Sequence, residues 1–339
     1  MPAIAPLPPD EAARLAALRG FEILDTPPDP RFDLFTRLAA RTLGTPLAAI
    51  NLVDDERTWY KSTLGFRPYE PARATSICAH AVGLGEPVMV LEDAAQDPRF
   101  ADHPMVTGPL GLRFYAGALL RTPEGHALGT LCIGDTVPRR LEEAARQTLL
   151  DLASGVGAML ELHRTALRLH RAATLDHLTG LANRAGFEQA LGRAVAGALR
   201  GAPCALLCLD LDRFKAVNDT HGHAAGDAML REVARRIGAT LRQSDLAARL
   251  GGDEFAVLLP APIDAAGAEA MAGRLLEGFA APWSFQGIPI PLRSSVGLAL
   301  CPRDATDAEA LLRAADRALY AAKAAGRGCW QAAPDPFGI

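Results

Sequence analysis

The chain has 339 residues, enough for two ordinary domains, and its 49% hydrophobic and 22% charged residues are typical of a globular protein. A formal net charge of −4 provides no basic field for nucleic acid, and no apolar run reaches the about 18 residues that cross a membrane. The N-terminus lacks the features of a secretory signal and the six cysteines form no Cys-x-x-Cys pair, so we expect a cytoplasmic protein with free thiols.

Residues 1–137 mix helical and strand patterns. Residues 31–44 place apolar side chains on one helical face, and residues 47–53 form a compact apolar run. Two further strand-like runs, 114–122 and 126–135, flank the turn Pro123-Glu124-Gly125. These patterns predict an α+β domain built on an antiparallel sheet.

Residues 138–175 predict one long helix. Leu149, Leu152, Val156 and Met159 follow a 3-4-3 spacing, which favours a coiled coil with a second copy of the chain. The alternative is a single amphipathic helix that packs on its own domain. The histidines at 163 and 170 fall on the predicted seam.

Residues 176–330 predict a second α+β domain. Strands are expected at 204–209 and about 293–300, and helices at 224–242, about 264–280 and about 307–325. This order suits an antiparallel sheet with helices on one side or both. Residues 331–339 are left as a C-terminal tail.

The segment Gly251-Gly252-Asp253-Glu254-Phe255 has apolar flanks and predicts a β-hairpin with a Gly-Gly turn and acid groups at its tip. Asp210 ends a buried strand, and it converges with Asp253 if that strand pairs beside the hairpin. Two carboxylates suit Mg²⁺ or Mn²⁺, which bridge the phosphate oxygens of a nucleoside triphosphate. A helix cap or a solvated turn is the alternative for either aspartate alone.

With the stretch from Asp210 to Asp227, this hairpin resembles the signature of the GGDEF family, the diguanylate cyclases, over nearly all of residues 174–330. The resemblance implies a palm-like fold related to nucleotide cyclases and polymerases. It also implies condensation of two GTP into cyclic di-GMP, with release of pyrophosphate, by a homodimer in which two catalytic domains face one another.

By matched position, the resemblance implies roles for individual residues. Asp210 and Asp253 correspond to the metal-binding carboxylates, with the Leu211 carbonyl as a further ligand. Glu254 corresponds to the acid that helps to activate the ribose 3′-hydroxyl, and it is also a candidate metal ligand. Asn218 and Asp227 correspond to the guanine-reading pair. Phe214 and Lys215 correspond to the phosphate-binding turn, and Lys323 and Arg327 correspond to a second phosphate clamp.

Asp227 can accept hydrogen bonds from guanine N1–H and N2–H₂, which adenine does not offer. The resemblance therefore implies specificity for GTP, which argues against a cyclase that makes mixed cyclic GMP-AMP. For Lys323 and Arg327, the alternative is a solvated C-terminal turn favoured by the helix dipole. For His221 and His223, we expect loop hydrogen bonds in place of a metal site.

Arg242 and Asp245 form an Arg-x-x-Asp pair, and five residues separate Asp245 from Gly251, which matches the spacing of the product-inhibition site in this family. The resemblance implies that cyclic di-GMP binds there, with Arg274 as a supporting residue from a neighbouring domain. A surface ion pair is the alternative. The motif from Asp176 to Arg184 is expected to supply capping and turn bonds.

Residues 18–137 resemble the GAF family of small-molecule sensor domains. The residues that carry this resemblance are 24–33, 51–55, 58–62, 76–80 and 129–133. We expect Cys78 to be a buried thiol and His80 to be hydrogen-bonded, although the pair is similar to a chromophore-attaching Cys-His. The ligand of this domain is not identified by the sequence.

The sequence thus predicts a diguanylate cyclase regulated by a GAF domain and by its product. Two rivals stay open: a catalytically silent receptor for GTP or cyclic di-GMP, and a signalling scaffold that acts through the GAF domain and the long helix.

Overall fold

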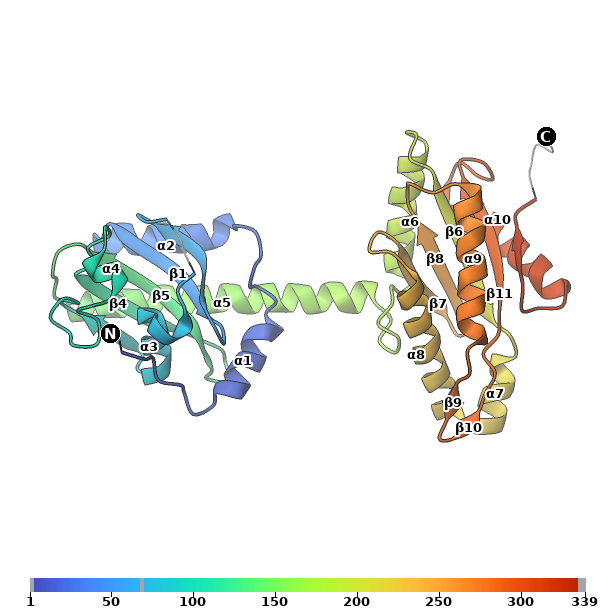
Figure 1. The fold of residues 1–339 in the computed structure, drawn as a ribbon. Helices are drawn as coiled ribbons and strands as arrows, with labels where there is room; N and C mark the ends of the chain where they lie inside the picture. Colours follow the sequence, from blue (N-terminus) through green and yellow to red (C-terminus); the bar gives the residue numbers. More distant parts are fainter. Residues whose placement is uncertain (1–2, 68–69, 335–339) are drawn as a thin grey trace. The chain divides into compact units, whose positions relative to one another are not determined.

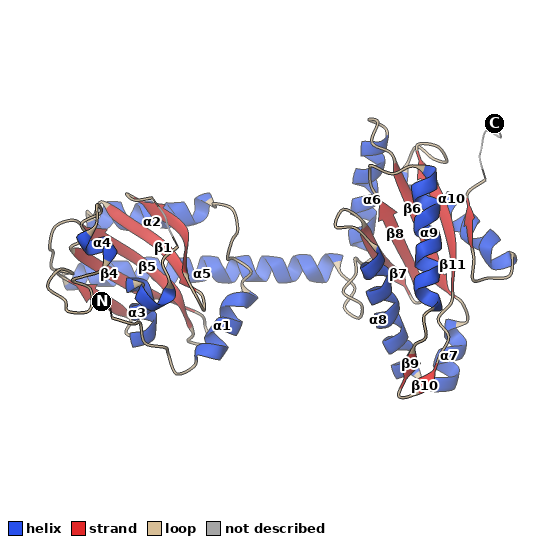
Figure 2. Cartoon of the chain, in the orientation of Figure 1, coloured by secondary structure: helices blue, strands red, loops and turns tan. Residues whose placement is uncertain are grey.

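The computed structural model describes residues 3–67 and 70–334, and it divides the chain into two compact units, Met1–Arg168 and Leu169–Ile339 (Figure 1). Each unit has a five-stranded sheet covered by helices on both faces (Figure 2). The α+β prediction is therefore confirmed. Of the tail expected at 331–339, residues 331–332 belong to a strand and 335–339 lie outside the described residues.

The sheet of the first unit is antiparallel throughout, in the order β2-β1-β5-β4-β3. Strands β1, β4 and β5 are buried along nearly their whole length, and since alternate residues face opposite sides, both faces of the sheet need a helical cover. The elements are α1 (Glu11–Gly20), α2 (Pro30–Leu43), β1 (Leu47–Val53), β2 (Thr58–Leu64), a 3₁₀ turn (Arg73–Thr75), α3 (Ile77–Leu84), β3 (Val88–Leu91), α4 (Pro104–Thr107), β4 (Phe114–Arg121) and β5 (Ala127–Asp135).

Helices α1 and α2 pack on one face of this sheet, together with the start of the long helix α5 (Glu143–Thr174). Helices α3 and α4 pack on the other face. Asp29 begins α2 with a side-chain hydrogen bond to the N–H of Arg31, and Gly44 ends it with a φ of 62°. Such residues at the two ends fix where the helix starts and stops.

The first half of α5 corrects one prediction. Leu149, Ala153, Val156 and Leu160 lie in the core of the first unit, against its sheet. A seam with a second copy through Leu149 and Val156 is therefore wrong, and the alternative of an amphipathic helix on its own domain holds here. In the second half, by contrast, the side chains of Leu162 and Leu169 are 57% and 66% exposed.

The sheet of the second unit has the order β12-β11-β6-β8-β7, in which only the β11–β12 pair is parallel. Its elements are α6 (Arg184–Ala198), β6 (Cys204–Leu211), α7 (Phe214–His221), α8 (His223–Thr240), β7 (Leu246–Gly251), β8 (Glu254–Leu259), α9 (Ala265–Ala280), β9 (Ser284–Phe285), β10 (Ile288–Pro289), β11 (Ser294–Cys301), α10 (Ala308–Ala324) and β12 (Trp330–Ala332).

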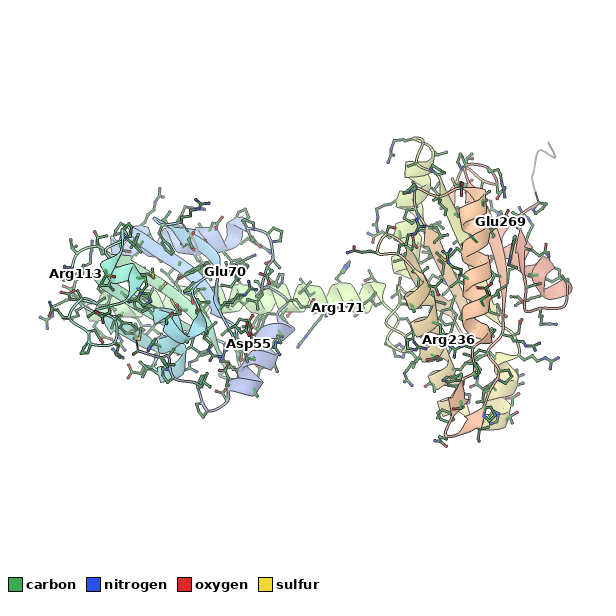
Figure 3. All side chains as sticks on the ribbon, in the orientation of Figure 1. Asp55, Glu70, Arg113, Arg171, Arg236 and Glu269 are labelled. Atoms are coloured by element: carbon green, nitrogen blue, oxygen red, sulfur yellow. The ribbon has the colours of Figure 1, made fainter. Side chains whose placement is uncertain are left out.

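Helices α8 and α9 cover one face of this sheet, and α6 and α10 cover the other. Arg236, labelled on α8 in Figure 3, is 9% exposed and donates to the carbonyls of Gly278, Phe279 and Ala281 at the end of α9. Because these carbonyls have no partner within the helix, the guanidinium closes the end of α9 and ties it to α8. Among the described residues, no helix is long and apolar enough to cross a membrane.

Candidate functional site

The carboxylates of the second unit meet at the ends of two neighbouring strands. Asp210 near the end of β6 lies directly opposite Glu254 at the start of β8. Gly251 pairs with Glu254, so Gly252 and Asp253 form the two-residue turn between β7 and β8. Gly252 has a φ of 51°, a region that glycine adopts easily. The predicted hairpin and the predicted convergence of Asp210 with Asp253 are both present.

The electrostatics of the site follow from this crowding. Burial, and then the charge of Asp210, raise the pKa of Asp253 above its usual range. Nζ of Lys323, on α10, lies 2.7 Å from Oδ2 of Asp210. A cavity of about 260 Å³ opens beside these groups, lined by Asp210, Glu254 and Lys323 among others. The site thus holds acid groups in excess, partly neutralised by one lysine.

The candidate phosphate-binding turn lies between β6 and α7. Arg213 has a φ of 62° at this turn, and Phe214 and Lys215 begin α7. Asp212, which the sequence analysis did not single out, holds the turn in place. Its carboxylate accepts from the hydroxyl of Ser295 at 2.9 Å and from the N–H of Gly328 at 2.9 Å.

Arg327 lies next to Gly328, and its Nε is 4.0 Å from Oδ1 of Asp212. Through Asp212, the structure therefore brings the β6–α7 turn and the segment of Arg327 together. The alternation of Asp210 and Asp212 along the end of one strand was the signal that could have identified Asp212.

The two residues of the candidate guanine-reading pair lie on successive helices, α7 and α8. Asn218 lies on α7, and Asp227 follows Gly226 on α8. A Cβ atom on Gly226 would lie 2.0 Å from Oδ1 of Asn218, so the Asn218 amide occupies the space that a side chain at 226 would fill. Asp227 is exposed. The Asn218 amide therefore packs on α8 at Gly226, one residue before Asp227.

The candidate product site lies on the corner between α8 and β7. The backbone N–H of Arg242 donates to Oδ2 of Asp245 at 2.9 Å, and the Arg242 residue is exposed. Arg274 lies on α9, where its Nη2 is 3.5 Å from Sδ of Met271. This geometry gives Asp245 a structural task in the corner, in addition to any role toward a ligand.

Two arginines lie near the hairpin: Arg249, which the sequence analysis missed, and Arg184, which ends the motif that begins at Asp176. Arg249 joins Asp176 to the turn of the hairpin, because its guanidinium donates to the Asp176 carboxylate and to the carbonyl of Gly252. Arg184 lies 4.0 Å from Glu254, with both side chains more than half exposed, so this pair contributes little to stability. Asp176 and Asn183 accept the expected turn and cap hydrogen bonds, from Thr179 and Gly186.

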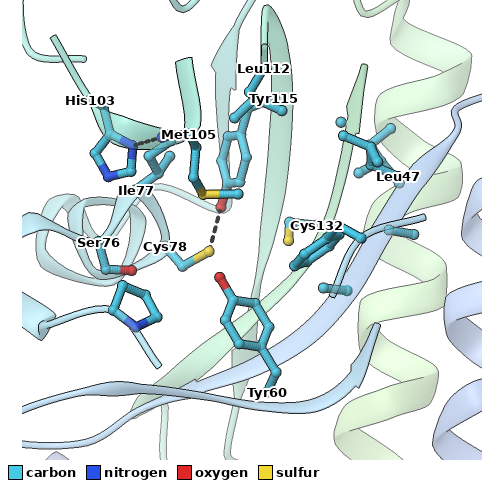
Figure 4. Close-up of a pocket in the computed structure, with 16 residues that line it drawn as sticks. Leu47, Tyr60, Ser76, Ile77, Cys78, His103, Met105, Leu112, Tyr115 and Cys132 are labelled. Atoms are coloured by element: carbon cyan, nitrogen blue, oxygen red, sulfur yellow. Dashed lines mark hydrogen bonds between the residues drawn. The ribbon is translucent and has the colours of Figure 1, made fainter. Parts of the chain in front are cut away.

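The first unit has its own cavity, of about 30 Å³, between its sheet and α3 (Figure 4). Tyr60, Cys78, Tyr115 and Cys132 line it. As expected, Cys78 is buried, and His80 is buried with its Nδ1 2.9 Å from the carbonyl of Ser76.

Comparisons with known proteins define the class of each unit. The family profile described as "Diguanylate cyclase, GGDEF domain" matches residues 173–329, and that described as "GAF domain" matches residues 27–160. The chain therefore joins an N-terminal GAF domain to a C-terminal GGDEF domain. It belongs to the GGDEF family.

Individual relatives agree with this assignment. The diguanylate cyclase TpbB of Pseudomonas aeruginosa is 43% identical over 202 residues, which are 56% of this chain and 46% of TpbB. The cyclic di-GMP phosphodiesterase PA2567 of the same species is 34% identical over 308 residues, which are 88% of this chain and 49% of that protein. This chain spans less than half the length of both curated relatives.

Among solved structures, the coiled coil and GGDEF domain of DgcB from Caulobacter crescentus, in complex with c-di-GMP, is 34% identical. The match covers 54% of this chain and 97% of that one, with a TM-score of 0.50. The relatives include proteins named for opposite reactions, a diguanylate cyclase and a cyclic di-GMP phosphodiesterase.

Proposed function

We propose that this chain is a diguanylate cyclase that condenses two GTP into cyclic di-GMP and two pyrophosphates. The observation that carries the proposal is the register that sets Asp210 opposite Glu254, with Asp253 in the adjoining turn and Lys323 on Asp210. Phosphoryl transfer requires groups that neutralise charge on the phosphate, and this arrangement supplies both anchors for cations and a cation.

The donor set fits a hard divalent cation such as Mg²⁺ or Mn²⁺. Asp210, Asp253 and the carbonyl of Leu211 offer oxygen ligands, which such ions prefer. The pKa of Asp253 is raised by burial and then by the charge of Asp210, and a bound cation would offset both effects. Among the described residues, no three His, Cys, Asp or Glu side chains gather as ligands, so substrate oxygens would complete the shell. When bound, the ion supplies charge stabilisation at the triphosphate.

The remaining residues would bind and orient GTP. Lys323 and Arg327 would hold phosphates from the side of α10, and the turn at Phe214 and Lys215 from the side of α7. Glu254 is exposed at the strand end, where its carboxylate can accept the proton of the ribose 3′-hydroxyl.

Guanine would be read by Asn218 and Asp227. The carboxylate accepts from N1–H and N2–H₂, so an adenine base would leave Asp227 without its donors.

The reaction requires two active halves, because the 3′-hydroxyl of each GTP attacks the α-phosphorus of the other. We propose that the second half of α5 supports this dimer. Leu162, Ala166, Leu169 and Ala173 are all exposed there and follow a 4-3-4 spacing, the pattern of a short coiled-coil seam. The GAF domain would regulate the enzyme through this helix, and its ligand is unidentified.

Product would bind at Arg242 and Asp245 and limit turnover, with Arg274 of a neighbouring domain in support. The exposed guanidinium of Arg242 can donate two parallel hydrogen bonds to guanine or phosphate. We place the activity in the cytoplasm, where GTP is available.

The test is to incubate purified protein with GTP and Mg²⁺ and to separate the nucleotides by chromatography. Glu254→Ala is the test variant, and Glu269→Ala, an exposed position on α9 labelled in Figure 3, is the matched control. We expect cyclic di-GMP from the wild type and from Glu269→Ala, and none from Glu254→Ala.

If the wild type carries no bound product and releases no pyrophosphate, the proposal fails and the receptor function takes its place. The phosphodiesterase named among the relatives gives this second candidate its weight, because a matching region occurs in a protein not named as a cyclase. A phenotype that survives Asp253→Ala in cells would point to the scaffold function.

A further inference from the structure

Two cysteines of the GAF domain share one hydrogen-bond donor. Nδ2 of Asn51 lies 3.2 Å from Sγ of Cys78 and 3.6 Å from Sγ of Cys132. Cys78 is in the first turn of α3, and Cys132 is in the middle of β5, so the two thiols approach from a helix and from the sheet beneath it. The cysteines are 4% and 8% exposed.

The surroundings favour a thiolate at Cys78. A hydrogen bond from Cys132, followed by those of Tyr115, Thr130 and Asn51, outweighs burial and lowers the pKa of Cys78 to about 7. The hydroxyl of Tyr115 donates to Sγ of Cys78 at 3.5 Å (Figure 4). The pKa of Cys132, in contrast, lies well above its usual range. One sulfur is therefore poised as the nucleophile and the other is held as a thiol.

The cavity beside the sulfurs sets the size of the reactant. Its volume of about 30 Å³ exceeds the 10–15 Å³ or so that a water molecule needs, and it is far too small for a nucleotide or a chromophore without movement of side chains. Figure 4 shows the Cys78 sulfur on this cavity, between Tyr60 and Tyr115. A small hydroperoxide such as hydrogen peroxide fits this space.

A further buried group lacks a partner in the reduced form. Oδ1 of Asn51 is fully buried and accepts no hydrogen bond within the part of the chain that the structure describes. Buried acceptors without a donor are costly. A sulfenic acid on Cys78 carries an O–H group, which supplies a donor beside this amide.

We propose that Cys78 and Cys132 form a redox site that a small hydroperoxide oxidises to a disulfide. In the first step the Cys78 thiolate attacks one peroxide oxygen, the O–O bond breaks, and Cys78 sulfenic acid and hydroxide form. In the second step the Cys132 sulfur attacks the Cys78 sulfur. The S–O bond breaks, an S–S bond forms, and the thiol proton leaves with the hydroxyl as water. The two thiols lose two electrons, and the peroxide gains them.

The bond would link α3 to β5, since each cysteine belongs to one of these elements. The sulfurs must close to about 2.05 Å, which requires a side-chain rotation, and the adjoining cavity provides room for it. Oxidation would then hold α3 on the sheet and change the lining of the cavity.

The chain contains its own control pair. Cys204 and Cys301 are directly opposite on β6 and β11 of the GGDEF domain, and both are buried. Burial, followed by the charge of Cys301, raises the pKa of Cys204 to about 12, and burial also raises that of Cys301. Two neighbouring thiols with little thiolate should resist peroxide. This pair therefore tests whether proximity of two thiols is sufficient for their oxidation.

The experiment uses the reduced full-length chain, treated with hydrogen peroxide and analysed by non-reducing peptide mapping. We expect a Cys78–Cys132 cross-link with the loss of two hydrogens, formed about tenfold faster than any oxidation of the half-buried Cys329. Cumene hydroperoxide, which is too bulky for the cavity, should act much more slowly. In Cys132→Ser, which lacks the second thiol, mass spectrometry should show oxygen added to the peptide of Cys78.

Cys301→Ser should leave this reaction unchanged. If Cys78 in the wild type stays reduced under conditions that oxidise Cys329, the proposal is overturned without recourse to any variant. The same holds if Cys204 and Cys301 oxidise first, or if the bulky hydroperoxide reacts as fast as the small one. Because the readout is a covalent bond, it does not depend on cyclase activity.

Discussion

Arg249 bonds at once to Asp176, just beyond the end of α5, and to the turn of the catalytic hairpin. Its Nη1 is 3.2 Å from Oδ2 of Asp176, and its Nε and Nη2 donate to the carbonyl of Gly252 at 2.9 and 2.8 Å. Both side chains of the ion pair are about 15% exposed. The end of the long helix and the position of Asp253 are therefore mechanically connected within the GGDEF domain.

The first prediction concerns this connection. We expect Arg249→Ala to lower kcat about tenfold or more, because the Gly252 carbonyl loses two donors and the turn that holds Asp253 loosens. Arg249→Lys keeps the charge near Asp176 but cannot donate in a fork, so kcat should fall there as well. Steady-state kinetics checks this. Arg235→Ala is the control, because Arg235 forms an exposed ion pair with Glu232 on α8. A rise in KM alone would contradict a positioning role.

The second prediction concerns Lys323 and the metal site. Since Nζ of Lys323 forms an ion pair with Oδ2 of Asp210 at 2.7 Å, we expect the lysine to compete with a divalent cation for this carboxylate when nucleotide is absent. Lys323→Met should therefore bind Mn²⁺ about tenfold more tightly without nucleotide, and should raise KM for GTP through loss of a phosphate contact. Titration followed by electron paramagnetic resonance measures the first effect. Unchanged Mn²⁺ affinity would show that Lys323 does not compete with the cation for the Asp210 carboxylate.

The third prediction concerns Gly226, which packs against the candidate guanine-binding residue Asn218. Gly226→Ala places a methyl group 2.0 Å from Oδ1 of Asn218, which must move, so KM for GTP should rise about tenfold. Gly238→Ala, on the same helix with nothing within 4 Å of its Cβ, is the matched control and should stabilise the helix by about 0.5–1 kcal/mol. Equal KM values for GTP in the two variants would show that Asn218 does not take part in base recognition.

The fourth prediction concerns the buried Arg236. Its replacement by Ala leaves three carbonyls at the end of α9 without their donor, and it should cost about 2–4 kcal/mol of the GGDEF domain's free energy of unfolding. Thermal unfolding of the full chain measures the shift. Arg235→Ala, at the neighbouring position with a 66% exposed side chain, should change stability by less than about 0.5 kcal/mol. Comparable losses in both would contradict the capping role.

The fifth prediction is the pH dependence of the GAF domain. Burial alone would raise the pKa of Glu11, but hydrogen bonds from Arg14 and Arg73 lower it to about 2. A carboxylate whose pKa is lowered on folding stabilises the protein above its unfolded pKa, and this contribution is lost as pH falls from about 4.5 to about 2. About 2 kcal/mol should disappear over this range.

Thermal unfolding between these pH values checks the effect. In Glu11→Gln the GAF domain should be less stable at neutral pH, and its stability should depend less on pH in this window. Glu142→Gln, at an exposed position, should behave like the wild type.

Local patterns carried a large part of this fold. The apolar runs at 204–209 and 255–259 identified strands, and the Gly-Gly-Asp-Glu segment identified the hairpin turn, because turn chemistry and local hydrophobicity are properties of neighbouring residues. The position of Asp210 at a strand end could be predicted for the same reason. Its proximity to Asp253 required only that β6 pairs with β8.

The tertiary structure decided what the apolar face of α5 contacts. The 3-4-3 spacing of Leu149, Leu152, Val156 and Met159 suits a coiled coil and a domain surface equally, and only the sheet beneath the helix settles that these residues face their own core. The same limit applies to Arg249, Asp212 and Lys323. Each acts on residues far along the chain, and sequence spacing carries no information on which distant carboxylate or carbonyl a long side chain will reach.

The two thiols of the GAF domain show this division most directly. Composition and context predicted that Cys78 and Cys132 are free and buried, because apolar neighbours in the sequence imply burial. That both sulfurs meet one amide nitrogen, 27 and 81 residues from it along the chain, follows from the packing of α3 on β5. The sequence determined the chemistry that each side chain brings, and the fold decided which of these chemistries meet, because contact between distant residues depends on packing.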